Sequence, residues 1–179
     1  MSSPTSLAQS LAVMRGALRE DFARNERLGQ RLTLVIWRAG NALAGRRDPA
    51  SLLLRVLQKA AVAVWFHGVL GAEIPTSVPI GPGLWLPHSA RGCVIHPSVV
   101  IGAGCTLYHE VTIGLAGDTG TAARIGDGVY LAAGAKILGP LTLGDGSRVG
   151  ANAVLLTDAR PGTTYVGVPA RPTGGGSAA

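Results

Sequence analysis

Residues 125–155 read IGDGVYLAAGAKILGPLTLGDGSRVGANAVL, and every sixth residue of this stretch is aliphatic. These six anchor residues are Ile125, Leu131, Ile137, Leu143, Val149 and Leu155. The interval of six also holds upstream, at Ile74, Ile80, Leu86, Ile95, Ile101, Leu107 and Ile113, with one longer step. Short repeats of this kind form stacked units that bury a core only against their neighbours. The pattern therefore predicts a mainly β fold, a parallel β-helix, after residue 72.

The residues around each anchor support this prediction. The position two before an anchor is small or aliphatic, as at Val99, Val129 and Ala135. Alternate residues of a strand share one face, so both positions are expected to point into the core. Glycine follows many anchors, as at Gly102 and Gly126, and is expected to permit the bend into the next strand. Three such strands would close one triangular coil of about eighteen residues.

The charges divide the chain into two parts. Residues 1–72 carry ten Lys or Arg against four Asp or Glu, whereas residues 73–179 carry six of each. The basic residues are not interleaved with aromatics and no nucleic-acid motif is present, so nucleic acid is not an expected partner. Two interpretations of the basic region stay open. We favour a helical cap that packs on the solenoid and on partner subunits over peripheral contact with an anionic membrane.

Hydrophobic spacing predicts helices before the repeat, over residues 6–30 and from about residue 30 to residue 44. A third helix is expected to be capped by Ser51 and to run to Leu70. Its apolar end, from Ala60 onward, is too short to cross a bilayer and is expected to be a buried helix or a partner surface.

Three segments follow from these patterns. They are an α-helical N-terminal region over residues 1–72, the β-helix over residues 73–172, and a Gly- and Ser-rich tail over residues 173–179 that is expected to be disordered. The first residues do not resemble a signal peptide, so a cytoplasmic location is expected. Both cysteines, Cys93 and Cys105, fall two residues before an anchor and are expected to be buried free thiols.

The repeat is interrupted twice. The step from Leu86 to Ile95 is nine residues, so three extra residues around Ser89–Gly92 are expected to bulge out of the coil. Thr119 occupies a later anchor position, but its neighbours have the composition of a loop. Interruptions in a regular solenoid are places where functional side chains can be presented.

Three segments carry a family resemblance. They are Val111-Thr112-Ile113-Gly114, the run from Gly134 to Gly139, and the ending Gly167-Val168-Pro169-Ala170-Arg171. Over about residues 71–172 the chain resembles bacterial serine acetyltransferases, and also the short relatives thought to acetylate exopolysaccharides such as colanic acid. The resemblance implies a left-handed parallel β-helix, a homotrimer with active sites between subunits, and acetyl-CoA as acyl donor without a metal. It leaves open whether trimers pair further.

His88 matches the catalytic histidine of that family, and Glu73 matches the position of its orienting carboxylate. Histidine suits the chemistry because its ordinary pKa lies near neutrality, so it can take the proton from an acceptor hydroxyl. The repeat places Glu73 and His88 at the same edge of the prism on adjacent coils. A carboxylate there could hold one imidazole nitrogen and leave the other for the substrate.

His109 and Arg91 are candidates for the acceptor site. The three-residue insertion puts His109 one coil above His88 on the same edge, and Arg91 lies within the insertion itself. The remaining histidines, His67 in the third helix and His96 at the start of a coil, are expected to be structural.

The resemblance also assigns donor-binding residues. Backbone groups of small residues are expected to hold CoA, and Lys136 and Arg171 could meet its phosphates. The small residues that match these positions are Gly114, Ala132 and Ala151.

Two departures concern acceptor recognition. Pro87 stands where the family has an aspartate that helps to bind serine, and Ala122-Ala123-Arg124 replaces a segment that carries a second active-site histidine. A site that loses polar partners discriminates less well between substrates. Acetyl transfer is therefore predicted more firmly than the identity of the acceptor.

The residues and the resemblance together predict an acetyl-CoA-dependent O-acetyltransferase of the serine acetyltransferase type, in which a histidine base deprotonates an acceptor hydroxyl that attacks the thioester. The same chemistry on a sugar, an exopolysaccharide or another small hydroxyl compound is the main alternative. A zinc enzyme like the β-helical carbonic anhydrases is a remote alternative that needs three histidines around the metal. A scaffold without catalytic activity is a further alternative, against which the pairing of Glu73 with His88 argues.

Overall fold

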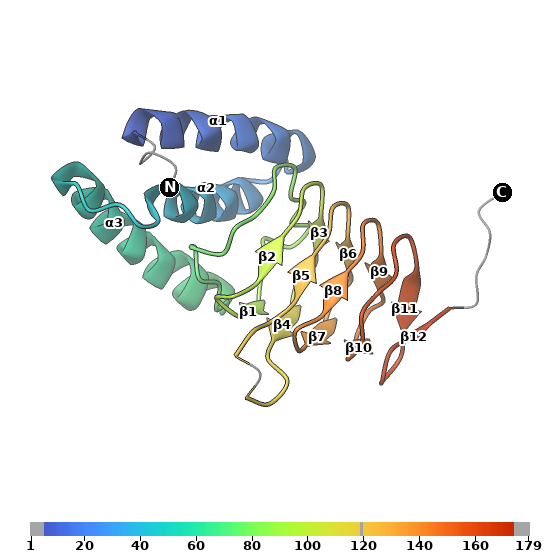
Figure 1. The fold of residues 1–179 in the computed structure, drawn as a ribbon. Helices are drawn as coiled ribbons and strands as arrows, with labels where there is room; N and C mark the ends of the chain where they lie inside the picture. Colours follow the sequence, from blue (N-terminus) through green and yellow to red (C-terminus); the bar gives the residue numbers. More distant parts are fainter. Residues whose placement is uncertain (1–5, 119, 174–179) are drawn as a thin grey trace.

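The computed structural model describes residues 6–118 and 120–173, in which helices precede a solenoid of short strands (Figure 1). The helices are α1 (Leu7–Arg24), α2 (Leu28–Leu43), α3 (Pro49–Val62) and the π-helical segment η1 (Ala63–Leu70). The predicted anchor Thr119 and residues 174–179 of the predicted tail lie outside the described residues.

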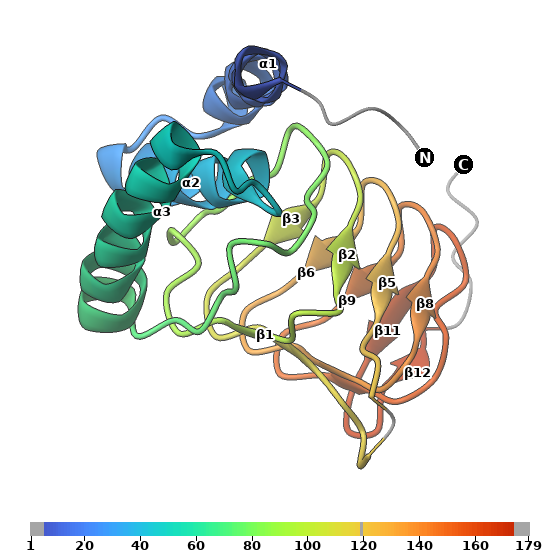
Figure 2. The same ribbon diagram turned by 60° about the vertical axis from the view of Figure 1, so that its left-hand side comes forward.

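The strands form the three faces of a prism (Figure 2). The first face holds β1 (Val94–Ile95), β4 (Thr112–Gly114), β7 (Lys136–Leu138) and β10 (Val154–Leu155). The second holds β2 (Val100–Ile101), β5 (Arg124–Ile125) and β8 (Thr142–Leu143). The third holds β3 (Thr106–Leu107), β6 (Tyr130–Leu131), β9 (Arg148–Val149), β11 (Thr164–Val166) and β12 (Arg171–Pro172). All pairs are parallel except β11 with β12.

The predicted anchors stack directly above one another in the core. Ile95 pairs with Ile113, which pairs with Ile137 and then Leu155, and these four side chains are 0–2% exposed. The residues two positions earlier, such as Val111 and Ala135, are also buried. The parallel β-helix predicted from the spacing of six is therefore confirmed.

Both interruptions of the repeat appear in the strand register. Glu73 pairs with Val94, which is farther along the chain than one regular coil, and the excess accommodates the insertion around Ser89–Gly92. Ile113 pairs with Ile137 across a coil that is one repeat step longer than the regular coil from Ile137 to Leu155. The coil that contains the degraded step is thus longer by one repeat step between β4 and β5.

Glycines after the anchors have a different role from the one predicted. Gly102 does not adopt a positive φ, so the bend there does not depend on the conformational freedom of glycine. A Cβ atom added to Gly102 would lie 2.6 Å from the carbonyl oxygen of Gly126 in the next coil. The corner therefore excludes a side chain because neighbouring coils stack too closely. The bend uses other glycines, such as Gly128 with a φ of 64°.

Helix α3 begins differently from the prediction. Asp48, and not Ser51, caps the helix, because its side chain accepts a hydrogen bond from the backbone N–H of Ser51. Pro49 occupies the first turn, where its missing N–H costs nothing. The Ser51 hydroxyl donates to the Asp48 carboxylate, and this bond holds the pKa of Asp48 below its ordinary value.

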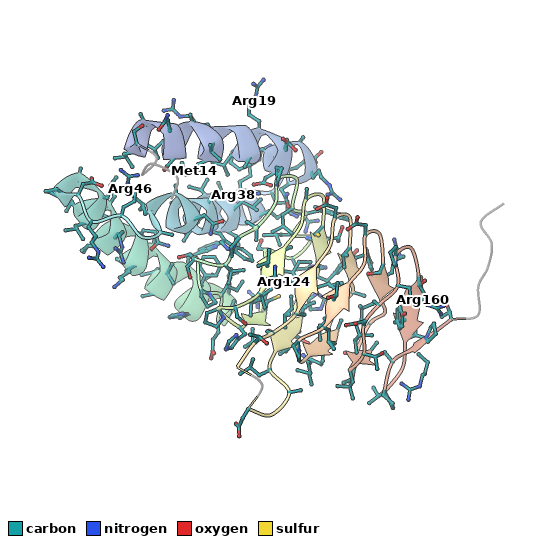
Figure 3. The ribbon with its side chains drawn as sticks, in the orientation of Figure 1. Met14, Arg19, Arg38, Arg46, Arg124 and Arg160 are labelled. Carbon is teal, nitrogen blue, oxygen red and sulfur yellow. The ribbon has the colours of Figure 1, made fainter. Side chains whose placement is uncertain are left out.

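The helices cover the end of the solenoid at which the first coil begins and has no preceding coil (Figures 1 and 2). Arg38 of α2 points toward this end (Figure 3) and forms a buried ion pair with Asp21 of α1, with N–O distances of 2.9 Å. The same guanidinium donates to the carbonyl oxygens of Ile80 and Gly81, at 2.6 and 2.7 Å. Asp21 also accepts the backbone N–H of Leu84.

The side chain of Asn25 makes the hydrogen bonds to the first coil that the backbone of a preceding strand would make. Its side chain donates to the carbonyl oxygen of Leu84 and accepts from the backbone N–H of Leu86, at 2.8 and 2.9 Å. The indole N–H of Trp37 donates to the carbonyl oxygen of Val78. Buried backbone groups need partners, and at this end of the prism the helices supply them through side chains.

The two thiols are buried and free, as predicted. Burial raises the pKa of Cys93 to about 12 and that of Cys105 to about 11. These values favour the neutral, unreactive thiol near neutral pH, so both cysteines behave as small core residues.

Candidate active site

His88 lies at the corner where the chain leaves the third face of the prism and turns toward β1. Its side chain is exposed and lines a cavity of about 270 Å³. The cavity is lined by Arg27, Pro87, His88, Ser89, Arg91 and His109. An exposed imidazole in a concave site can reach a substrate hydroxyl, as a general base requires.

His109 occupies the same corner one coil higher, as the repeat predicts. The rings of His88 and His109 meet edge to face, with their centroids 4.6 Å apart and an interplanar angle of 79°. The Nδ1 atom of His109 is buried and has no hydrogen-bond partner within the described residues. Both predicted histidines therefore line one cavity, and their rings are in contact.

Helix α2 supports the backbone on both sides of His88. The Gln30 side chain donates to the carbonyl oxygen of Pro87 at 3.2 Å. The Thr33 hydroxyl lies 2.9 Å from the carbonyl oxygen of Gly29 and 3.2 Å from that of Ser89, and it can donate its single hydrogen to either of them. Thr33 also accepts a hydrogen bond from the indole of Trp65. Ser89 has a φ of 58°, a left-handed conformation that is unfavourable for a residue with a side chain. The bonds from α2 help to hold this strained turn.

Glu73 does not contact His88 within the subunit. No hydrogen bond or ion pair between them is found in residues 6–118 and 120–173. Glu73 instead lines a separate groove of about 700 Å³ on the first face, together with His67, His96 and Gly114. The insertion around Ser89–Gly92 lengthens the corner between the two positions, so the predicted contact was placed too simply from the repeat.

Two arginines border the His88 cavity. Arg91 lies there as predicted, on the inserted turn, and its side chain is exposed. Arg27 lies at the start of α2 and was not predicted, because a contact between distant parts of the chain leaves no mark in local spacing. Among the described residues, the cavity lining holds two cationic side chains and no carboxylate, so it favours a ligand that carries negative charge.

The predicted donor-binding residues separate into two groups. Ala132 and Ala151 continue the His88 edge upward, since the backbone of this edge is linked from His109 to Gly134 and from Ala133 to Asn152. Lys136 follows the same edge, although its ammonium donates to the carbonyl oxygen of Glu110.

The other two donor candidates lie away from the middle of this edge. Arg171 is exposed on β12, at the C-terminal end of the solenoid. The backbone N–H of the preceding residue, Ala170, donates to the carbonyl oxygen of Val154. Gly114 ends β4 at the opposite edge of the first face. The five residues therefore do not lie on one edge of the subunit.

A row of aromatic side chains on the third face also leads to His88. Tyr108 lies between Trp85 and Tyr130, with ring centroids 6.2 and 5.5 Å away, and its ring is 5.9 Å from that of His88. Arg148 stacks over Tyr130 at 4.1 Å. The row could have been predicted from the sequence, because Trp85, Tyr108 and Tyr130 each lie next to an anchor of the third face.

The departures from the family pattern also have definite places. Pro87 lines the His88 cavity, so the missing aspartate would have stood beside the base. Ala122 and Ala123 are buried, 6% and 0% exposed, and Arg124 is exposed on β5. The segment that replaces the expected second histidine therefore offers no polar side chain except Arg124.

The structure does not assemble the three histidines that a zinc site would need. His96 lines the groove with Glu73, whereas His88 and His109 lie at the other corner. Within the described part of the chain, no three His, Cys, Asp or Glu side chains are arranged to hold a metal ion.

Comparison with known proteins identifies the class. Residues 122–157 match the family model "Bacterial transferase hexapeptide (six repeats)". The chain is 37% identical to a serine acetyltransferase of Helicobacter pylori over 140 residues, which cover 77% of each protein. It is 34% identical to that of Mycobacterium tuberculosis over 148 residues, 82% of this chain and 58% of the relative.

A solved structure of soybean serine acetyltransferase complexed with serine has a TM-score of 0.69 at 30% identity. It covers 92% of this chain and 69% of the soybean chain. Fold and repeat together define a hexapeptide-repeat transferase with a left-handed parallel β-helix. Within that class, the chain belongs to the serine acetyltransferase family.

Proposed function

We propose that the protein transfers the acetyl group of acetyl-CoA to the hydroxyl group of serine, with His88 as general base. His88 takes the hydroxyl proton while the serine oxygen attacks the thioester carbonyl. The carbon–sulfur bond then breaks, the thiolate of CoA takes the proton from His88, and O-acetylserine is released. The relatives are named serine acetyltransferases, and the soybean structure contains serine.

The observation that carries this proposal is the position of His88. It combines the family's histidine position with an exposed ring in a cavity, against His109 and on a turn that α2 supports. Arg27 and Arg91 supply positive charge where the carboxylate of an amino acid could bind.

His88→Ala is expected to lower kcat by at least about a hundredfold, because a positioned base contributes about 10²–10⁴ in rate. Thiol release from acetyl-CoA in the presence of serine measures it. Arg160→Ala, which removes an exposed side chain at the far end of the solenoid, is the control and should retain full activity. Full activity of His88→Ala would disprove the mechanism.

The role of Glu73 as the orienting carboxylate is also a proposal. Glu73 lines a groove separate from the His88 cavity, so its part in the reaction must be tested directly. Glu73→Gln should lower kcat while the affinity for CoA is kept. If kcat is unchanged, Glu73 has no part in the reaction.

We further propose a homotrimer with sites between subunits. The His88 cavity of about 270 Å³ is smaller than the range of about 300–1,000 Å³ usual for ligand sites, and it must accept both CoA and an acceptor. A neighbouring subunit would deepen it. Light scattering should give about three times the chain mass of 18.2 kDa, or six times if trimers pair. A monomer with full activity would exclude shared sites.

The aromatic row beside His88 favours a second candidate acceptor, a sugar or an exopolysaccharide unit. The exposed parts of Trp85 and Tyr108 offer flat apolar surfaces next to the base, and flat rings with polar tips suit partly polar ligands. Assays with serine and with a panel of sugars separate the two. Trp85→Ala should raise KM only if the acceptor is a sugar.

A cytoplasmic location is proposed because the two buried cysteines are free thiols, which agrees with a reducing compartment. Fractionation of cells that produce the tagged full chain would test it. Recovery in an extracellular or periplasmic fraction would contradict the proposal.

A further inference from the structure

Helix α3 and segment η1 present an apolar surface that nothing in the described part of the subunit covers. Leu53, Val56, Leu57 and Val64 are 60–66% exposed. Leu52, Leu54 and Val69 are also exposed. Pro49–Leu70 is a continuous run of 22 helical residues, long and apolar enough to cross a membrane, and 6% of its apolar window is buried. Of the two predictions for Ala60–Leu70, the exposure contradicts a buried helix and leaves a partner surface.

The helix is nevertheless fixed to the fold along its other side and at its end. Gln58 donates to the hydroxyl of Thr76, and Arg55 donates to the carbonyl oxygen of Arg46. Phe66 and Leu70 are buried against the first coil, and the carbonyl oxygen of Leu70 accepts the backbone N–H of Gly92. A helix held in this way would lie on a surface more readily than cross a bilayer.

The width of the apolar surface argues against packing of α3 on a single helix of a partner. Leu52, Leu53 and Leu54 are consecutive and all exposed, and three consecutive helical residues span about 200° around the axis. Two helices that pack against each other as a coiled coil each present a narrow stripe of apolar residues, spaced alternately three and four positions apart. A broad apolar face suits insertion among lipid acyl chains.

The charged side chains within Pro49–Leu70, Arg55 and Lys59, are both cationic. No Asp or Glu occurs from Pro49 to Leu70. Asp48 is engaged by Arg46 and Ser51, whereas Arg47 and Lys59 are exposed and form no ion pair within residues 6–118 and 120–173. Pairing α3 with α3 of a second copy would bring like charges together. A negatively charged lipid surface would attract them.

We propose that α3 and η1 form a docking surface for anionic membranes, with the exposed leucines and valines inserted at the boundary between the lipid head groups and the acyl chains. The proposal does not depend on the reaction at His88. It assigns the basic, apolar part of the N-terminal region to lipid contact and leaves α1 and α2 as the cap of the solenoid.

The test is sedimentation of the full chain with vesicles of phosphatidylcholine alone or mixed equally with phosphatidylglycerol. The protein should bind the mixed vesicles and bind the neutral ones weakly. The double variant Leu53→Gln/Leu57→Gln should bind at least about tenfold less, because each buried leucine contributes strongly. Arg47→Gln and Lys59→Gln should each reduce binding about fivefold.

Val13→Gln is the matched control, since Val13 of α1 is also an exposed apolar residue. It should bind as the unmodified chain does, and circular dichroism should show that every variant is folded. Absence of binding to mixed vesicles would overturn the proposal. So would unchanged binding by the leucine variant, or a fall in its oligomer mass by light scattering without loss of vesicle binding, which would assign the surface to a second copy.

Discussion

Helices α2 and α3 follow each other in sequence and are both rich in apolar residues, yet they have opposite environments. In α2, Leu34, Ile36 and Trp37 are buried, whereas in α3 the largest apolar side chains face outward. The difference lies in polar side chains. Helix α2 carries Arg38 and Trp37, which satisfy backbone groups of the first coil, and the exposed apolar surface of α3 offers no such groups. Hydrogen bonds thus decide which helix caps the solenoid.

The largest effect is expected from breaking the buried ion pair that fixes α1 and α2. Asp21→Ala leaves the Arg38 guanidinium buried without its carboxylate and should lower the free energy of unfolding by about 3–5 kcal/mol. Urea denaturation measures the change. Asp21→Ala/Arg38→Leu should recover part of it, because no unpaired charge is left. A single variant as stable as the unmodified chain would mean that α2 is not fixed in this way.

A smaller loss is expected at Asn25. Asn25→Ala removes the partners of the Leu84 carbonyl and the Leu86 N–H and should cost about 1–3 kcal/mol. Denaturation with urea measures this too. A change smaller than that of a single ordinary hydrogen bond would mean that water satisfies these groups and that the side chain does not replace a strand.

The two buried thiols extend the comparison to the core of the solenoid. In the unfolded chain each thiol ionises near pH 9, but burial raises the pKa of Cys93 to about 12 and that of Cys105 to about 11. The folded state therefore binds more protons above pH 9, so stability falls as pH rises, by about 1.4 kcal/mol per thiol near pH 10. Cys93→Ala/Cys105→Ala should show a shallower fall in unfolding free energy. An equal slope would contradict the buried thiol pKa values.

A kinetic effect is expected where α2 meets the candidate site. Thr33→Val removes the hydroxyl that accepts from Trp65 and can donate to the carbonyl oxygen of Ser89 or of Gly29. It should lower kcat about tenfold, or about 1.4 kcal/mol in the barrier. KM for acetyl-CoA should stay unchanged. Thr33→Ser keeps the hydroxyl and should restore kcat. Equal losses in both variants would indicate a packing defect and not support of the turn.

The smallest effect is expected on α3. Val56→Gln changes a side chain that is 64% exposed, so the free energy of unfolding should change by less than about 0.5 kcal/mol. Denaturation in the absence of lipid measures it. A loss as large as that caused by a polar substitution in a buried core would show that α3 is covered in the free protein, and would remove the contrast with α2.

The parts of the fold that depend on local periodicity could be predicted from sequence. Ile113 and Ile137 were placed in the core because each coil repeats the same spacing, and His109 was placed above His88 by the same count. Glu73 was placed wrongly with respect to His88, because the count says nothing about the path of an inserted turn.

Contacts of the helices were beyond the reach of the repeat. Asp21 and Arg38 lie on different helices, and Asn25 of the helical region meets Leu86 of the first coil, so no spacing rule links them. The sequence shows that glycine follows the anchors, but not why glycine is needed there. The reason is the short distance between stacked corners, which appears only in three dimensions.

Strand β12 closes the far end of the third face. It runs antiparallel to β11, and Val166 pairs with Arg171, so the edge that would receive another coil is occupied by the chain's own backbone. Pro172 also lacks a backbone N–H to offer to a further strand. With α1 and α2 at one end and β12 at the other, the solenoid has a fixed length. Copies of this protein should therefore associate side by side and should not grow end to end into fibres.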